Sequence, residues 1–225
     1  MGVDYAESVG RYMKLELRDD LTADELSAMA ARGDYMSESL VGKSFDEAME
    51  GTDKDLQEFL NDKAYRGHFG VFEHRTPAFF IEGLSRVAMA QVTRHRHLSF
   101  DVQSQRYVDF RHKDPVVPPS FVENGWDERL QAHFNHSVDL YEEAIDDGVP
   151  KEDARFFLPQ ATPVNMTMSG NNRAFMHLLD LRNNKKAQWE AQEFSRKVER
   201  ELMDHAPHTF TAYKDKTNNN SLRSP

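Results

Sequence analysis

Basic and neutral hydrogen-bonding side chains crowd one short stretch of the chain, RHRHLSFDVQSQRY, which begins at Arg94 and ends at Tyr107. Its members are Arg94, His95, Arg96, Ser99, Ser104, Gln105 and Arg106. Guanidinium groups bind phosphate through paired hydrogen bonds, so this set suits a ligand with phosphates and polar ring edges. The alternative is that each arginine pairs with a carboxylate of an acidic surface, which is the better explanation for any single arginine.

A second candidate site is the sequence MSGNNRAFMHLLDLR, where a strand is predicted to give way to a helix after Gly170. Asn171, Asn172 and Arg173 would lie at the start of that helix, where free backbone N–H groups favour an anion. The alternative is an ordinary asparagine cap on a helix that packs into the core through Phe175, Leu178 and Leu179.

A metal site is not expected, although His68, Glu73 and His74 lie close together in GHFGVFEH. A protein-bound metal needs converging histidine, cysteine or carboxylate ligands, and no second cluster stands at ligand spacing. The sequence also lacks the glycine-rich fingerprints of Rossmann and P-loop nucleotide sites and the GxSxG elbow of serine hydrolases.

Composition restricts the class of protein. The 225 residues carry a net charge of −10, which disfavours a general nucleic-acid binder because such proteins neutralise phosphates. The chain has no cysteine, which excludes disulfides, thiolate metal ligands and cysteine nucleophiles within it. No apolar run approaches the roughly 20 residues of a membrane span, and the N-terminus resembles no secretion signal. We therefore expect a cytoplasmic protein that does not bind membranes.

The elements that must position the basic stretch are mostly helical. The patterns predict helices over 22–32, 52–67, 85–96, 126–147, 151–159, from 171 onward and over 186–204, with strands over 76–82 and 161–169. The 85–96 helix, capped by Ser85, would carry Arg94–Arg96 on its last turn. We expect one helix-rich α+β domain over 1–210 with an antiparallel sheet and flanking helices, followed by a disordered tail over 211–225.

Together these segments resemble one enzyme family. Arg94–Arg96, seven residues and then Ser104 match the RHR-x7-S motif of the flavin-dependent thymidylate synthases. GHFGVFEH, ARFFLP and GNNRAFMHLLDLR are similar to further family segments, so the resemblance extends over roughly 65–205. It implies reductive methylation of dUMP to dTMP, with methylenetetrahydrofolate as carbon donor, FAD as cofactor and NADPH as reductant.

The resemblance also implies roles for individual residues. Arg182 would be catalytic, stabilising charge on the pyrimidine, and Ser104 would join it as a hydrogen-bonding partner of the nucleotide. The expected flavin-binding residues are His68, Gly70, Arg94, His95, Arg96, Val102, Asn171, Asn172, Arg173 and His177. The expected dUMP-binding residues are Gln91, Arg94, Ser104, Gln105, Arg106, Arg155 and Arg182.

The chain departs from the family pattern at three positions. Asp101 stands where asparagine is common, Val102 where glutamate or glutamine is common, and Gly70 where serine or threonine is frequent. Since Val102 and Gly70 offer no side-chain hydrogen bond, we expect retained activity with weaker cofactor binding.

The resemblance further implies a homotetramer with active sites shared between subunits. Two alternatives stay open from the residues: a single-stranded nucleic-acid-binding module that uses the basic and aromatic residues of 94–113, and a flavoprotein that binds nucleotide without methylating it.

Overall fold

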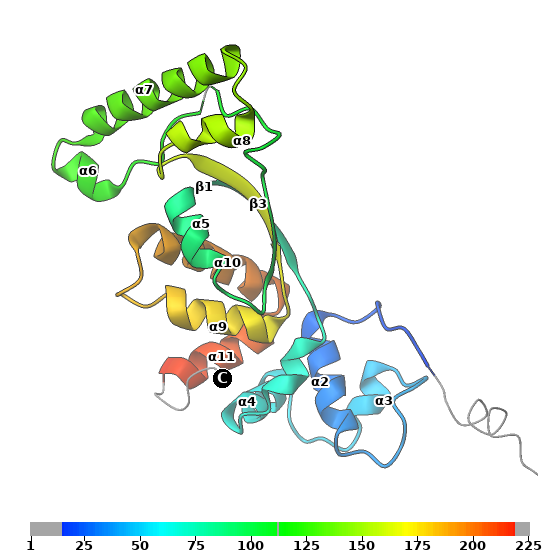
Figure 1. Ribbon diagram of the computed structural model, residues 1–225. Helices are drawn as coiled ribbons and strands as arrows, with labels where there is room; N and C mark the ends of the chain where they lie inside the picture. The colour runs from blue at the N-terminus through cyan, green and yellow to red at the C-terminus, as the bar shows by residue number, and fades with distance from the viewer. Residues whose placement is uncertain (1–14, 112, 219–225) are drawn as a thin grey trace, which may run out of the picture. The chain divides into compact units, whose positions relative to one another are not determined.

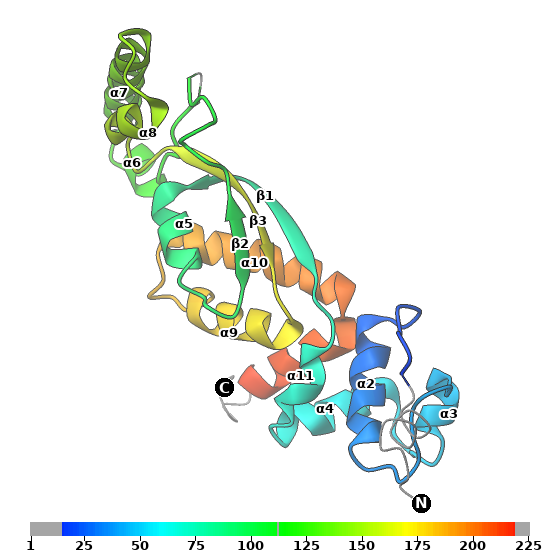
Figure 2. The ribbon, with the colours of Figure 1, turned by 45° about the vertical axis from the view of Figure 1, so that its right-hand side comes forward.

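The computed structural model describes residues 15–111 and 113–218 (Figures 1 and 2). The chain divides into two compact units. Residues 15–75 and 201–218 form the first unit, and residues 76–111 with 113–200 form the second. The prediction of a helix-rich α+β fold with an antiparallel sheet is confirmed. No helix of these described ranges is long and apolar enough to cross a membrane.

The first unit is helical. It contains α2 (Ala23–Gly33), α3 (Phe45–Met49), α4 (Leu56–Tyr65), the 3-10 helix η1 (Phe69–Glu73) and α11 (Pro207–Asn218). The predicted helix over 22–32 is confirmed as α2. A capping box starts it, since the Thr22 hydroxyl accepts from the Glu25 N–H and the Glu25 carboxylate accepts from the Thr22 N–H. The predicted start of α4 at Thr52 is wrong. Asp55 caps this helix, because its carboxylate accepts from the Glu58 N–H at 2.8 Å.

Helix α11 corrects the predicted disordered tail, which is wrong for residues 211–218. Its Phe210 and Tyr213 are buried, and the helix packs beside α4 within the first unit (Figures 1 and 2). Buried Asp24 accepts from the backbone N–H groups of His208 and Thr209, each at 2.9 Å, and so caps the start of α11. Long-range interactions of this kind leave no local pattern in a polar sequence. Residues 219–225 of the predicted tail lie outside the described residues.

The second unit is built on a three-stranded antiparallel sheet. Its strands are β1 (Ala78–Ser85), β2 (Ser99–Val102) and β3 (Pro163–Ser169), and β3 lies between the other two. β3 alternates as predicted, with Val164, Met166 and Met168 buried. β1 runs three residues beyond the predicted end, because pairing with β3 resumes at Leu84 after an irregularity beyond Ile81. The sequence did not predict β2, which is only four residues long.

Helices cover one face of this sheet. They include α5 (Arg86–Val92), α9 (Asn172–Arg182) and α10 (Trp189–His205), whose residues 201–205 belong to the first unit. Figure 1 shows these three helices on the same side of the strands. The ring of Phe175 on α9 meets the ring of Phe79 on β1 edge-on, with centroids 5.3 Å apart.

The remaining helices of this unit are α6 (Pro119–Glu123), α7 (Asp127–Asp146), α8 (Lys151–Ala154) and the 3-10 helix η2 (Arg155–Phe157). The predicted helix over 126–147 is confirmed as α7, whose buried residues include Phe134, Val138 and Tyr141. Tyr141 joins a core cluster with Phe110, Ala154 and Val164. The sequence did not predict α6, which is a single short turn that begins with Pro119.

Candidate active site

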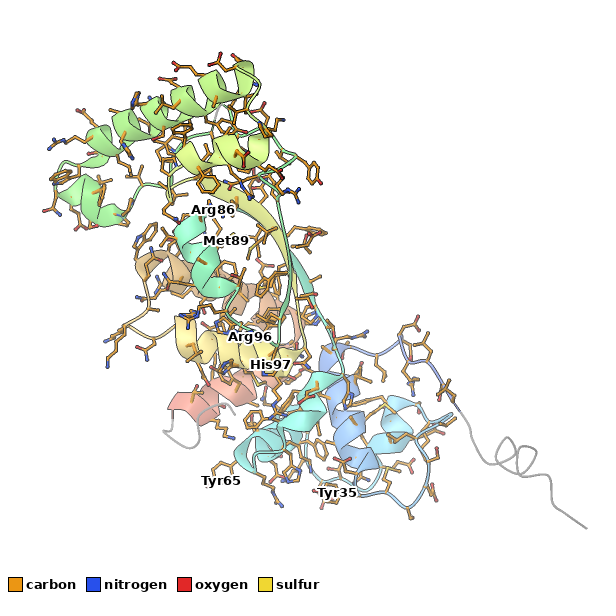
Figure 3. The ribbon with its side chains drawn as sticks, in the orientation of Figure 1. Tyr35, Tyr65, Arg86, Met89, Arg96 and His97 are labelled. Atoms are coloured by element: carbon orange, nitrogen blue, oxygen red, sulfur yellow. The ribbon has the colours of Figure 1, made fainter. Side chains whose placement is uncertain are left out.

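The basic motif lies on a turn rather than on a helix. Ser85 caps α5 as predicted, but α5 ends at Val92 and not near residue 96. The Thr93 hydroxyl donates back to the Met89 carbonyl at 2.9 Å, and the His95 and Leu98 N–H groups then close successive turns. This turn exposes Arg94 and Arg96 and buries His95, which is 4% exposed. Figure 3 shows Arg96 and His97 on this turn, close to α9.

Arg182 forms hydrogen bonds with two other predicted site residues, His95 and Gln91. It is the last residue of α9, and its Nε donates to Nε2 of His95 at 3.0 Å. Its Nη2 donates to the backbone carbonyl of Gln91 at 2.8 Å. The two bonds fix the guanidinium plane between the end of α5 and the basic turn.

This arrangement determines the protonation of His95. A guanidinium only donates, so Nε2 of His95 must accept and the ring must be neutral, with its proton on Nδ1. Burial, together with the nearby Arg182 and His177, lowers the pKa of His95 to about 4. Nδ1 is buried and has no hydrogen-bond partner within the described part of the chain.

Positive charge is concentrated around Arg182. Burial lowers the pKa of Arg182, and the nearby Arg94 lowers it as well. The His177 ring lies edge-on to the His95 ring, with centroids 5.5 Å apart. An arginine keeps its charge at neutral pH, so Arg182 and Arg94 together provide a cationic site that an anion would stabilise.

The start of α9 lies against the basic turn. A Cβ placed on Gly170 would come within 2.3 Å of the Leu98 side chain and 3.5 Å of the His97 carbonyl. Glycine at this position therefore allows the β3–α9 connection to approach the turn closely. Two segments that are far apart in the sequence, both predicted to bind the flavin, meet here.

The start of α9 combines a helix cap with an unsatisfied buried amide. Asn171 caps the helix by accepting from the Ala174 N–H at 2.8 Å, and Phe175, Leu178 and Leu179 are buried, as in the core-helix alternative. The Asn172 side chain is fully buried, yet neither of its amide atoms has a hydrogen-bond partner among the described residues. An unsatisfied amide at the start of a helix is suited to a polar ligand.

A second group of arginines lies around Glu152. The Arg106 Nε donates to its carboxylate at 2.6 Å, and the Arg155 Nε donates to its backbone carbonyl at 2.9 Å. The Ser104 hydroxyl accepts from the Arg106 N–H at 3.2 Å, which closes a local turn. Gln105 is buried, and its Nε2 has no partner in the described ranges. The structure thus brings together four residues predicted to bind the nucleotide.

Sequence reasoning missed Arg86. Burial lowers the pKa of Arg86, and the nearby Arg155 lowers it further, so these two cations lie near each other. Arg86 is the first residue of α5, where the helix dipole opposes a positive charge. An arginine directly after a predicted helix cap is an unfavourable placement that is visible in the sequence, and it could have indicated a binding role for Arg86.

Sequence reasoning also missed Glu190. Its buried carboxylate accepts from both the backbone N–H and the hydroxyl of Ser85. These bonds attach α10 to the start of α5, and so to the helix that ends in the basic turn. Glu190 lies 105 positions after Ser85 in the chain, and no local pattern indicated its role.

Val102 lies where β2 passes the core cluster, against which it packs. It also lines a groove of about 690 Å³ over the sheet, together with residues that include Phe80, Asp101 and Ser104. The acidic Glu82 and Asp101 line the same groove, and their negative charge disfavours an anionic ligand there. Phe80 is 89% exposed there.

His68 and Gly70 belong to the first unit. His68 follows α4, and its Nδ1 lies 3.4 Å from the Tyr35 hydroxyl. Gly70 is exposed, and a Cβ added to it would meet nothing within 4 Å. No group of three or more histidine or carboxylate side chains that could hold a metal is found among residues 15–111 and 113–218.

The family model named thymidylate synthase complementing protein (Thy1) matches residues 16–208. The chain belongs to this family. The family prediction is confirmed, and with it the assignment to an enzyme class.

Named relatives agree with the family model. The flavin-dependent thymidylate synthase of Haloarcula marismortui is 38% identical over 88% of this chain and 93% of its own length. That of Halobacterium salinarum is 39% identical over 84% of this chain and 90% of its own length. A UMP/dUMP methylase, PolB from Streptomyces cacaoi, crystallised with 5-Br dUMP, shares the fold with a TM-score of 0.71 and 20% identity over 89% of this chain and 94% of that one.

Proposed function

We propose that the protein is an FAD-dependent thymidylate synthase that converts dUMP to dTMP in the cytoplasm, with methylenetetrahydrofolate as carbon donor and NADPH as reductant. The observation that carries the proposal is the guanidinium of Arg182, fixed by His95 and the Gln91 carbonyl beside a second cation, Arg94. A preoriented charge of this kind stabilises negative charge that develops on a substrate.

Arg182 is the proposed catalytic residue. The chain has no cysteine, so it cannot activate the uracil ring by attack of a thiolate. A fixed guanidinium beside the ring would instead stabilise negative charge on its polar edge. Neutral His95 holds the Nε of Arg182 in place without competing for that charge.

The residues around the start of α9 fit a flavin dinucleotide. Exposed Arg94 and Arg96 and the positive end of the α9 dipole would hold its phosphates, and the buried Asn172 amide would bind a polar edge. Arg173 and His177 are proposed to complete that site, and by resemblance to the family His68 and Gly70 of the first unit are also proposed to contact the flavin. Bound FAD would supply the reducing electrons of the reaction.

The second arginine group suits the nucleotide. Arg106 and Arg155 would bind the phosphate of dUMP, while Ser104, Gln105 and Gln91 would bind polar groups of the nucleotide. The unpartnered Nε2 of buried Gln105 supports a ligand at this position. Val102 and Gly70 offer no side-chain hydrogen bond, so we expect weaker FAD binding than in relatives with polar residues there.

A homotetramer with shared sites completes the proposal. The exposed Phe80, which lines a groove of mixed polar and apolar residues over the sheet, offers apolar surface that a second copy of the chain would cover. Sedimentation of the purified protein would measure its assembly state directly.

The test is an absorption spectrum of the purified protein, followed by an assay of dTMP. We expect bound FAD, bleaching of its absorbance by NADPH when dUMP is present, and dTMP once methylenetetrahydrofolate is added. Bleaching without dTMP would identify a non-methylating flavoprotein. A colourless protein that takes up no added FAD would refute the proposal and favour a nucleic-acid binder.

A further inference from the structure

Lys216 is a buried cation in α11, a helix that continues beyond the residues 16–208 matched by the family model. Its side chain is on the side of α11 that packs against α4, and it is 4% exposed. Burial lowers the pKa of its ammonium group. A buried ammonium is costly, so its surroundings must compensate for the lost hydration.

The Lys216 ammonium contacts the corner where α4 ends and η1 begins. It donates to the Ala64 carbonyl and lies 4.1 Å from the centroid of the Phe69 ring. Ala64 and Phe69 lie on either side of a glycine cap in the chain. Gly67, at φ +80°, donates to the Ala64 carbonyl, and the His68 N–H donates to the Lys63 carbonyl.

His68 and Gly70 are the two neighbours of Phe69 in the chain, and both are proposed to contact the flavin. Phe69 itself is buried, whereas Gly70 is exposed. The Lys216 ammonium therefore contacts two groups: the Phe69 ring, between His68 and Gly70, and the Ala64 carbonyl in the last turn of α4. A change at Lys216 would act on the flavin through this corner, without contact with the ligand.

We propose that Lys216 is a positioning residue that holds the α4–η1 corner, and with it His68 and Gly70, in the geometry that binds FAD. The inference rests on the proposed function for its ligand. Its structural part, the ordering of residues 66–73 by Lys216, is independent of any ligand.

The experiment measures backbone hydrogen exchange of residues 66–73 in the full chain without flavin, and then the dissociation constant for FAD. In Lys216→Met we expect faster exchange in this segment and unchanged exchange in β3. We also expect FAD binding to weaken by roughly 3- to 10-fold, because a desolvated cation–π contact is strong but acts on the ligand only indirectly, through His68 and Gly70. Lys216→Arg should restore both. Lys214→Met, which removes the same group from an exposed position of α11, is the matched control.

Unchanged exchange of residues 66–73 in Lys216→Met would overturn the inference, whatever happens to FAD binding. If Lys216→Met does not fold, Phe69→Leu removes the ring under the ammonium and should give the same local increase in exchange, and its absence would count equally against the inference. If the unaltered protein binds no FAD, the proposed function fails, while exchange still decides whether Lys216 orders the corner.

Discussion

Two groups of arginines in the second unit differ in what they contact. Arg182 directs its two hydrogen bonds to neutral acceptors, the His95 ring and the Gln91 carbonyl. Arg106 instead pairs with the Glu152 carboxylate, and both of these side chains are about half exposed. The first guanidinium keeps its charge for a ligand, whereas the second has part of its charge already compensated.

The difference shows why an arginine count is a poor guide to a site. An exposed ion pair contributes little to stability and opens readily, so Arg106 can exchange its carboxylate for a phosphate. A half-buried guanidinium on neutral acceptors cannot relax in that way. It is held in one orientation, which is what electrostatic catalysis requires.

The largest effect is expected from Arg182→Ala. The variant should keep FAD but lose dTMP formation by roughly 10²–10³-fold, the usual cost of removing one preorganised group that stabilises developing charge. Turnover at saturating dUMP and the flavin spectrum measure the two properties. Arg182→Lys, which keeps a charge but loses the planar fork, should recover only part of the rate. Normal dTMP production by Arg182→Ala would remove this residue from the catalytic role.

The neutral His95 predicts a pH dependence of stability. The folded pKa of about 4 lies below the ordinary 6.5, so between these values the unfolded chain binds a proton that the folded chain does not. Stability should therefore fall as pH falls through this window, by up to about 3 kcal/mol. His95→Gln keeps an acceptor for Arg182 but cannot titrate. Parallel losses in the variant and the unaltered protein, measured by urea unfolding, would exclude His95 as the source.

Substitution of Glu190 tests whether its buried hydrogen bonds to Ser85, at the start of α5, stabilise the protein. Glu190→Ala leaves the Ser85 N–H and hydroxyl without their acceptor and should cost about 2 kcal/mol of unfolding free energy. Glu193→Ala, three residues further along α10, removes only an exposed ion pair with Lys197 and should cost less than about 0.5 kcal/mol. Equal costs in the two variants would show that the buried bonds add nothing.

The smallest effect is expected at the exposed pair. Glu152→Gln should change unfolding free energy by less than about 1 kcal/mol, because Arg106 and Glu152 are both hydrated. The KM for dUMP should change by only a few fold with kcat unaltered, since Arg155 keeps its bond to the Glu152 backbone carbonyl. A fall in kcat as large as that of Arg182→Ala would erase the distinction between the two groups.

Much of the local structure could be predicted because its cause lies within a few residues. Thr22 and Asn171 cap helices through side-chain bonds to N–H groups three residues ahead. The alternation that buries Val164, Met166 and Met168 has the two-residue period of a strand. The arginines of the candidate site and the start of α9 could be identified for the same reason, because they appear as particular residue types at a fixed spacing in the sequence.

What only the tertiary structure decided depends on partners far away in the chain. β2 forms because β3 supplies its hydrogen bonds, and α11 forms where Asp24 caps it and α4 covers it. The neutrality of His95 depends on burial and on Arg182, 87 positions away. The sequence by itself determined which charged residues the protein carries and where they lie along the chain. Packing determined which of these charges remain uncompensated, because desolvation and long-range hydrogen bonds act only once the chain has folded.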